Sequence, residues 1–199
     1  MAKKNIEHIT EYKKYASKNP LIRLALSLFF KELKKSFPRL KKANVIDIGC
    51  GDGFALKFLR KNFNYDFTGF DISPDTIRFA KKLNPNVKFI QGDIHKMPFD
   101  NRSFDIVVNL QVLEHLENPE KAINEMKRVS KRYCVLSVPR EPFFRLANVA
   151  RLKYLKTFGN YPDHIWQWSK RDFETILKKK FRKVNIRTST IWTIAVCEI

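Results

Sequence analysis

Three closely spaced glycines with acidic neighbours, in the run Asp47–Gly53 (Asp-Ile-Gly-Cys-Gly-Asp-Gly), are the residues best suited to chemistry. Glycine lets the backbone turn tightly and approach a ligand without a Cβ in the way. The spacing is G-x-G-x-G, whereas the pyrophosphate-binding turn of dinucleotide folds is G-x-G-x-x-G. Asp47 would repel a phosphate, but it suits a cationic ligand such as an amino acid that carries a sulfonium. The loop therefore predicts a site for a ligand of that kind.

Further polar residues stand where short apolar runs end. Asp71 closes one run, Asp93 follows the next, and Asn109 closes a third. Because the carboxyl ends of parallel strands share one edge of a sheet, these side chains are expected near the glycine loop.

The elements that must position these residues are short strands that alternate with helices. Asn19-Pro20 reads as the cap of a helix over residues 21–37. Strands are expected at residues 45–48, 67–71, 87–91, 104–109 and 133–138, with helices between them. A helix near 170–179 precedes two strands, 184–188 and 191–197, whose short link permits only an antiparallel hairpin. The expected fold is α/β, a doubly wound Rossmann-like seven-stranded sheet of five parallel strands plus a C-terminal antiparallel hairpin.

At residues 40–140 the chain resembles the class I S-adenosylmethionine-dependent methyltransferases. The glycine loop carries this resemblance together with Phe104–Leu116, which is similar to the pattern FDxVxxxxVLEHL. The resemblance implies S-adenosylmethionine as cofactor, with its methionine end on the loop, its ribose on Asp71 and its adenine near Asp93. The cofactor-binding residues that it implies are Asp47, Gly49, Cys50, Gly51, Gly53, Asp71, Ile72, Asp93, Ile94, Asn109 and Leu110.

One domain is expected over residues 1–199. It divides into an N-terminal helical cap (1–40), a cofactor-binding core (41–140), a substrate lid insertion (141–170), and a last helix with its hairpin (171–199). The insertion is aromatic, basic and longer than a simple crossover needs. Its pattern VPxEPxxRLxN…H…W(S/T) is similar to that of small-molecule methyltransferases of the ubiquinone-biosynthesis-like type.

Methyl transfer from a sulfonium depends mainly on alignment, and a general base is needed only if the acceptor must lose a proton. His115 and His164 are the candidate bases, with Glu114 less favoured. A structural contact for His115 and a packing role for His164 are the alternatives. Tyr15 and Trp168 are candidate acceptor contacts, and core packing is the alternative for both.

The net charge of +19 is concentrated at the two ends, with +9 in residues 1–44 and +7 in residues 141–199. Such ends could attract nucleic acid, an anionic surface or an acidic small molecule, or could simply be a solvated basic surface. The three cysteines are far apart in sequence, which predicts neither a disulfide framework nor a zinc site, so no metal is expected. No apolar run has the length of a membrane span, and the start lacks the apolar segment of a secretory signal. A cytoplasmic enzyme is expected.

The favoured function is methylation of O, N or C of a small or lipid-like acceptor by in-line displacement. The first alternative is methylation of RNA or another macromolecule that docks on the basic ends. No (D/N/S)-P-P-(Y/F) motif follows the fourth strand, which argues against methylation of nucleobase amino groups. The second alternative is a non-catalytic module that binds a cofactor or a partner.

Overall fold

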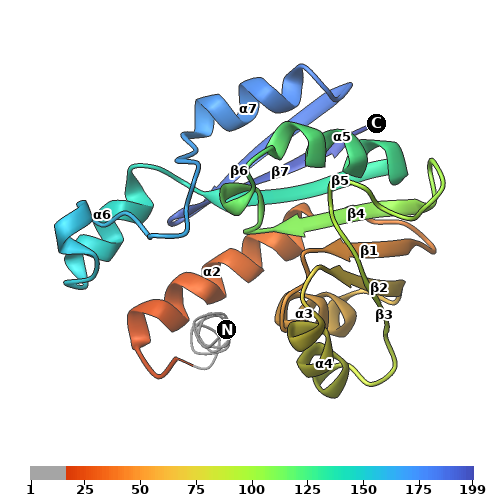
Figure 1. The fold of residues 1–199 in the computed structure, drawn as a ribbon, viewed down its shortest axis with the longest axis horizontal. Helices are drawn as coiled ribbons and strands as arrows, with labels where there is room; N and C mark the ends of the chain where they lie inside the picture. Colours follow the sequence, from red (N-terminus) through yellow and green to blue (C-terminus); the bar gives the residue numbers. More distant parts are fainter. Residues whose placement is uncertain (1–16) are drawn as a thin grey trace.

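The computed structural model describes residues 17–199, and its centre is a seven-stranded sheet in the order β3-β2-β1-β4-β5-β7-β6 (Figure 1). Strands β1 to β5 are parallel, and β7 runs antiparallel to both β5 and β6. The predicted fold class is thus confirmed. The strands are β1 Asn44–Ile48, β2 Asp66–Asp71, β3 Lys88–Gln91, β4 Phe104–Leu110, β5 Ser130–Pro139, β6 Lys183–Ser189 and β7 Trp192–Glu198.

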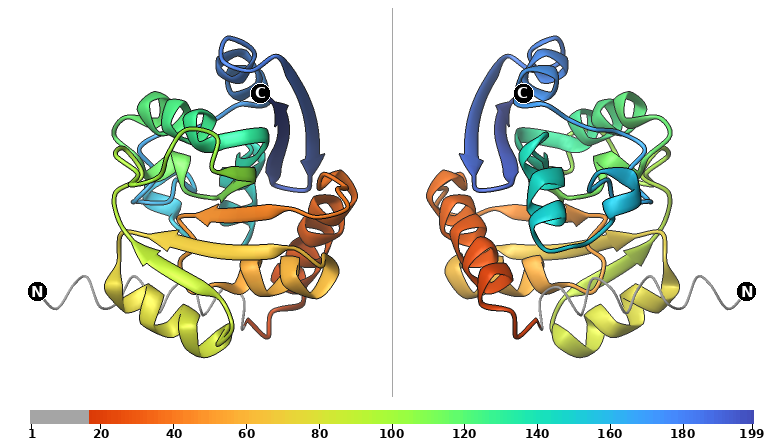
Figure 2. Two further views of the ribbon diagram at one scale, coloured as in Figure 1. Left: turned by 90° about the vertical axis from the view of Figure 1, so that its right-hand side faces the viewer. Right: turned by 90° about the vertical axis from the view of Figure 1, so that its left-hand side faces the viewer.

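Helices cover both faces of the sheet (Figure 2). Side chains of α5 and α7 pack on one face, and those of α2 and α3 pack on the other. No helix in the described part of the chain has the length and apolar character needed to cross a bilayer. The helices are α2 Pro20–Ser36, α3 Phe54–Asn62, α4 Pro74–Leu83, α5 Pro119–Val129, α6 Phe143–Ala150 and α7 Lys170–Lys178, with short 3-10 turns η1 Leu113–His115 and η2 Leu155–Thr157.

Local chemistry sets the element ends much as the sequence predicts. The side chain of Asn19 accepts the N–H of Leu21 at 2.9 Å, so the helix begins at Pro20 as expected. The fifth strand differs, since it begins at Ser130 instead of residue 133. Helix α5 ends at Val129 and leads directly into β5. The N–H of Ser130, the first residue of the strand, still donates to carbonyls in the last turn of the helix.

The order of the strands places the site. The chain leaves β1 toward β2 and β3 and then returns to β4 on the other side of β1. Open sheets of this kind bind ligands at such a reversal, outside the carboxyl ends of the strands. The insertion between β5 and α7, which contains α6, projects beyond the carboxyl ends of β4 and β5 (Figure 1).

Candidate active site

The loop between β1 and α3 turns through left-handed backbone at its glycines. The φ angle is +72° at Gly49 and +49° at Gly51, a conformation that residues with a Cβ rarely adopt. A Cβ on Gly49 would lie 2.5 Å from Cγ2 of Val112, whereas a Cβ on Gly51 would meet no atom of residues 17–199 within 4 Å. Contact with Val112 thus requires glycine at position 49, whereas the described residues leave space beside Gly51 that a ligand can enter.

Asp71, at the end of β2, fastens this loop. Its Oδ2 accepts the N–H of Gly51 at 2.8 Å, and its Oδ1 accepts the N–H of Ser73 at 2.9 Å and the hydroxyl of Thr76 at 3.2 Å. A carboxylate offers about four acceptor positions. One position therefore remains on Oδ2, although the family resemblance implies contacts to two ribose hydroxyls.

Asp47 lies beneath the loop, near the end of β1. Its side chain is 2% exposed, and its Oδ2 accepts no hydrogen bond from the residues that the structure describes. Burial, and to a smaller extent the neighbouring charge of Asp71, raises the pKa of Asp47 to about 7. A buried acid of this kind is poised to become charged when a cation binds beside it.

The part of the site where the adenine is expected is more exposed than the glycine loop. Ile72 is 68% exposed, and Ile94 is half-buried against the core. Oδ1 of Asp93 accepts the N–H of His95 at 2.8 Å and lies 3.0 Å from the Nδ1 of that ring. The hydrogen bond from the His95 main chain is the main reason that the pKa of Asp93 lies below its usual value. This carboxylate is therefore partly engaged in its own turn.

At the end of β4, Asn109 is fully buried, and its Nδ2 donates to the carbonyl of Ile48 at 2.8 Å. Its Oδ1 accepts no hydrogen bond from residues 17–199. Leu110 is half-buried against the core on the α2 face. Asn109 thus links the ends of β1 and β4 and leaves one buried acceptor open.

Gln111 makes the turn that follows β4, and no sequence motif marks it. Its φ is +62°, and its N–H and its Nε2 both donate to Ser137, each at 3.0 Å. This pinned turn sets Val112 against Gly49 and begins η1. A polar residue directly after a strand was the one available signal, and it is a weak one.

Segment 163–166 of the insertion is hydrogen-bonded to η1. The carbonyl of Glu114 accepts the N–H groups of Ile165 at 2.9 Å and Trp166 at 3.1 Å. The indole N–H of Trp166 donates to the carbonyl of Leu116 at 2.9 Å. Two distant stretches of the chain are thus held together beside the glycine loop.

This contact brings the two candidate bases together. Nδ1 of His115 lies 2.9 Å from the carbonyl of Asp163, and the centroids of the His115 and His164 rings are 5.0 Å apart. A carbonyl only accepts, so Nδ1 carries the proton and Nε2 of the neutral ring is free to accept one. One ligand atom each from Glu114, His115 and His164 lies within 4.8 Å of the other two. Two imidazoles and a carboxylate can hold a divalent cation as well as pass a proton.

Comparison with known proteins supports one family. Residues 46–137 match the family model for a methyltransferase domain. The chain is similar to ajmaline N-methyltransferase of Rauvolfia serpentina, with 34% identity over 47% of this chain and 34% of that protein. It is also similar to demethylmenaquinone methyltransferase of Chlorobaculum tepidum, with 30% identity over 65% of this chain and 53% of that protein. The chain thus spans about half or less of these curated relatives.

A solved S-adenosylmethionine-dependent methyltransferase from Archaeoglobus fulgidus shares the fold, with a TM-score of 0.68 and 17% identity over 87% of this chain and 94% of that chain. These comparisons support the resemblance to the class I S-adenosylmethionine-dependent methyltransferases. The cofactor of this superfamily is S-adenosylmethionine.

The candidate site fits that cofactor. Two buried acceptors, Oδ2 of Asp47 and Oδ1 of Asn109, lack hydrogen-bond donors among the described residues. The methionine part of the cofactor brings an ammonium with three donors and a sulfonium charge, and buried polar groups require such partners. Among residues 17–199, none fills the space beside Gly51 into which the cofactor would fit. Cys50, by contrast, is buried, and burial raises the pKa of its thiol, so it is no nucleophile.

Of the two candidate acceptor contacts, Tyr15 lies outside the described residues. Trp168 is 6% exposed, and its ring packs edge-on against Phe173 at 5.8 Å and stacks on Trp166 at 5.6 Å. The carbonyl of Trp168 also accepts the N–H of Glu141 at 3.0 Å. This arrangement favours the core-packing alternative, in which Trp168 anchors the insertion.

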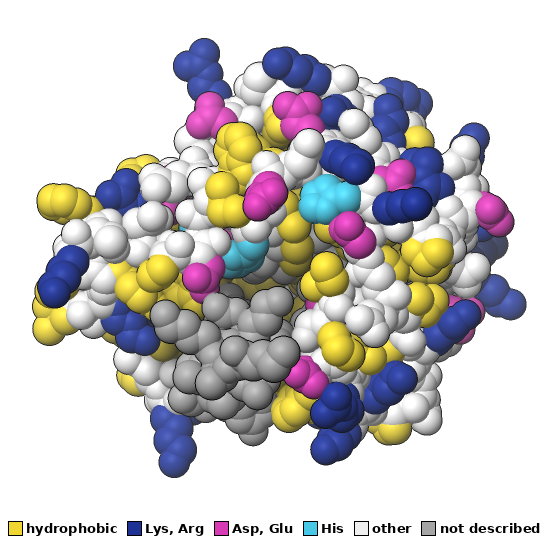
Figure 3. Space-filling view, viewed as in Figure 1, with side chains coloured by type: hydrophobic (Ala, Val, Ile, Leu, Met, Phe, Trp, Pro, Cys, Tyr) yellow, Lys and Arg dark blue, Asp and Glu magenta, His cyan; other side chains and the backbone are white. Residues whose placement is uncertain are grey.

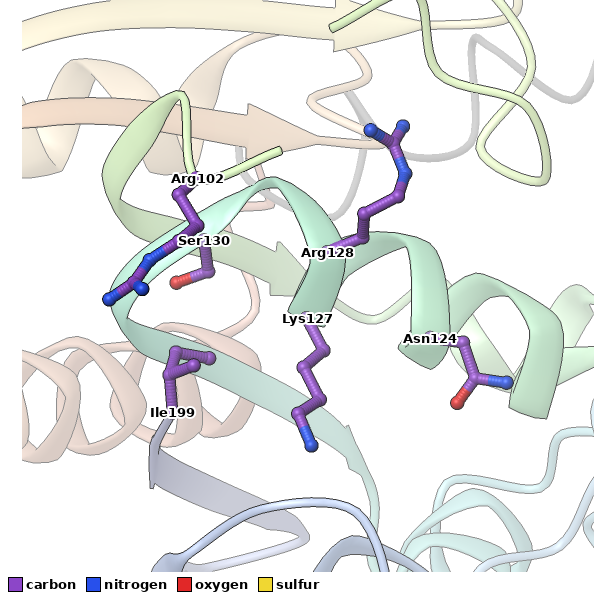
Figure 4. A pocket seen from close by; sticks show the side chains of 6 residues that line it. All are labelled: Arg102, Asn124, Lys127, Arg128, Ser130 and Ile199. Carbon is purple, nitrogen blue, oxygen red and sulfur yellow. The ribbon is translucent and has the colours of Figure 1, made fainter. Parts of the chain in front are cut away.

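A basic pocket of about 510 Å³ lies elsewhere, at the amino-terminal ends of β4 and β5 (Figure 4). Arg128 donates there to both carboxylate oxygens of Glu125, to Asn101 and to the carbonyls of Met97 and Phe99. These contacts use all of its N–H donors. Because it lies at the opposite ends of the strands, the pocket is separate from the candidate site. It is lined by Arg102, Asn124, Lys127, Arg128, Ser130 and Ile199.

Proposed function

We propose that this chain transfers the methyl group of S-adenosylmethionine to O, N or C of a small or lipid-like acceptor by in-line displacement. The observation that carries the proposal is the grouping of Gly51, Asp47 and Asp71 at one edge of the sheet, with His115 on the turn that packs against the same loop. When bound, the cofactor supplies an electrophilic methyl group on a sulfonium. Two relatives, an ajmaline N-methyltransferase and a demethylmenaquinone methyltransferase, support a small acceptor.

Asp47 and Asp71 have different tasks in this account. Asp47 stabilises positive charge from beneath the loop, because Oδ2 of its buried carboxylate accepts no hydrogen bond from residues 17–199. Asp71 keeps the loop in shape and offers its remaining acceptor position to a ribose hydroxyl. The residues thereby align the cofactor, which is the main requirement of a displacement reaction.

His115 serves an acceptor that must lose a proton. The Asp163 carbonyl fixes the tautomer, so Nε2 accepts the acceptor's proton and the imidazolium later returns it to water. His164 packs against this ring and against Phe144, at 5.2 Å between centroids, and it helps to hold both rings in place. An acceptor that reacts through a lone pair without losing a proton needs alignment alone.

A macromolecular acceptor has weaker support. The charged ends favour it, but the basic pocket lies at the wrong edge of the sheet and its Arg128 is already fully engaged. The non-catalytic alternative would leave the fixed tautomer of His115 without a use.

The test is formation of S-adenosylhomocysteine when the protein is supplied with S-adenosylmethionine and a panel of acceptors. The panel contains quinols, catechols, amines, amphiphilic lipids and RNA. We expect turnover with a small or lipid-like acceptor and a much weaker response in the Gly51→Val protein. Turnover with RNA alone would support the macromolecular alternative, and binding of the cofactor without turnover on any acceptor would support the non-catalytic one.

A further inference from the structure

The insertion ends in a tip, residues 143–160, whose apolar side chains point into solvent. Leu152 is 79% exposed, Phe158 is 77% exposed, and Leu146 and Leu155 are each more than half exposed. Leu152 and Phe158 are the two most exposed large apolar side chains in the described part of the chain. Figure 3 shows apolar side chains protruding beside Lys and Arg at the left-hand end of the molecule, where Figure 1 places α6. A cluster of exposed apolar side chains marks an interaction surface.

The inside of the tip is polar. Asn148 is 1% exposed, its Nδ2 donates to the carbonyl of Gly159 at 2.9 Å, and its own carbonyl accepts the N–H of Lys153 at 2.9 Å. A Cβ on Gly159 would lie 2.2 Å from the carbonyl oxygen of Arg145, so the turn closes tightly on the helix. These polar groups pair with one another inside the tip, whereas Leu152, Leu155 and Phe158 face out. This is the arrangement that an apolar environment requires.

The backbone of the tip is strained at the same residues. The φ angle is +56° at Leu152, +54° at Tyr154 and +49° at Phe158, although none of these is glycine. Left-handed backbone is unfavourable for residues with a bulky side chain. Strain and exposure at Leu152 and Phe158 both cost stability, so neither residue is explained by the fold of the isolated chain.

The charge of the tip has one sign. Residues 143–160 contain four basic residues and no acidic one. Lys153 and Lys156 are exposed and alternate along the chain with Leu152, Leu155 and Phe158. Apolar side chains interleaved with lysines are typical of segments that lie in the interface of an anionic bilayer, where the lysines meet the headgroups.

We propose that the tip docks on an anionic lipid bilayer, with Leu152, Leu155 and Phe158 entering the interface and Lys153 and Lys156 on the headgroups. The tip adjoins the candidate bases, since the ring of Phe144 in the tip and that of Tyr161, directly after it, lie 5.2 Å and 5.1 Å from the ring of His164. Docking therefore brings the acceptor side of the site to the membrane surface. The inference deepens the proposed function and rests on it for one point, that the acceptor is an amphiphile drawn from the bilayer.

The test is cosedimentation of the protein with vesicles made of phosphatidylcholine alone or of equal parts phosphatidylcholine and phosphatidylglycerol. We expect binding to the mixed vesicles, weak binding to phosphatidylcholine alone, and weakening as salt is added. The double variant Leu152→Asn/Phe158→Asn should lose about tenfold or more in affinity for mixed vesicles. Asparagine tolerates left-handed backbone, so the variant should melt at the same temperature as the wild type or higher.

Two lysine pairs provide a matched comparison. Lys153→Gln/Lys156→Gln should weaken binding to mixed vesicles, whereas Lys81→Gln/Lys82→Gln, an exposed pair on α4, should leave it near that of the wild type. Equal binding by the asparagine variant and the wild type would overturn the proposal. So would retention of the wild type on RNA with no binding to either kind of vesicle.

Vesicle binding is measured without cofactor or acceptor, which separates the two proposals. A protein that binds mixed vesicles but forms no S-adenosylhomocysteine would contradict the proposed function and leave docking intact. A protein that methylates a water-soluble acceptor and ignores vesicles would contradict docking alone.

Discussion

The main-chain N–H of Gly51 donates to Oδ2 of Asp71 at 2.8 Å, and this contact fastens the loop after β1 to the carboxyl end of β2. The same carboxylate caps the turn into α4 through Ser73 and Thr76. Asp71 is therefore a structural residue of the loop as well as the expected ribose ligand. Its substitution should affect both stability and cofactor binding.

Asp71→Ala should reduce cofactor affinity by about 1.5–3 kcal/mol, the scale of hydrogen bonds to a charged group. It should also lower the melting temperature of the protein without cofactor, because three donors lose their acceptor. Calorimetric titration and melting curves measure the two effects. Asp75→Ala is the matched control, since Asp75 is an exposed neighbour paired with Arg78. Near-normal affinity in Asp71→Ala would assign the ribose to another residue.

Asp47 should make stability depend on pH in a defined direction. Its pKa is about 7 in the folded protein against 3.8 for the ordinary carboxyl, so the folded state holds its proton more tightly. The neutral form is therefore favoured by folding, and stability decreases as pH rises from about 4 to about 7. Relative to Asp47→Asn, the wild type should lose about 2–3 kcal/mol of unfolding free energy between about pH 5 and about pH 8. Denaturant unfolding of both proteins checks this, and parallel pH profiles would contradict it.

His115 offers a variant that separates chemistry from structure. His115→Asn retains a side-chain N–H for the Asp163 carbonyl but has no counterpart of Nε2. With an acceptor that loses a proton, turnover should decrease by about a hundredfold or more, the scale of general-base catalysis. Cofactor affinity and melting temperature should remain near those of the wild type. If His115→Asn restores the turnover that His115→Ala loses, the contact with Asp163 is the whole role of this residue.

Trp168→Ala tests whether the insertion is anchored through the core. Truncating this buried ring should destabilise the protein by roughly 3–5 kcal/mol. Trp166→Ala, at a stacked but 42% exposed neighbour, should cost less. Melting curves measured beside the kinetics distinguish this role from a lid role. Lower turnover at unchanged stability in Trp168→Ala would support a mobile lid that contacts the acceptor.

The fold was largely predictable from local sequence patterns, because its strands and helix caps depend on residues that are near in sequence. Asn19 caps α2 and Ser73 caps α4 through short-range hydrogen bonds, and the short link before β7 permits only a hairpin. The structure of the insertion was less predictable. Helix α6 keeps Phe143 and Leu146 exposed, so it shows no conventional buried stripe. A pattern that assumes a buried apolar face cannot detect such a helix.

The candidate site divides in the same way. Its glycines and acidic residues were predictable, because they stand directly at the ends of predicted strands. The contact of Ile165 with Glu114 was not predictable, because it is made through a main-chain carbonyl, which every residue type has. The same holds for the tautomer of His115, which a distant carbonyl decides.

The central claim is that the loop around Gly51 binds S-adenosylmethionine, and calorimetric titration of the cofactor into three proteins tests it most directly. The wild type should bind in the low micromolar range or thereabouts, a scale typical of enzyme ligands. Gly51→Val should abolish binding. Gly51→Asn tolerates the left-handed φ of +49° but fills the open space, so it should fold and still bind much more weakly. No heat of binding with the wild type, or unchanged affinity in a folded Gly51→Asn protein, would contradict the account.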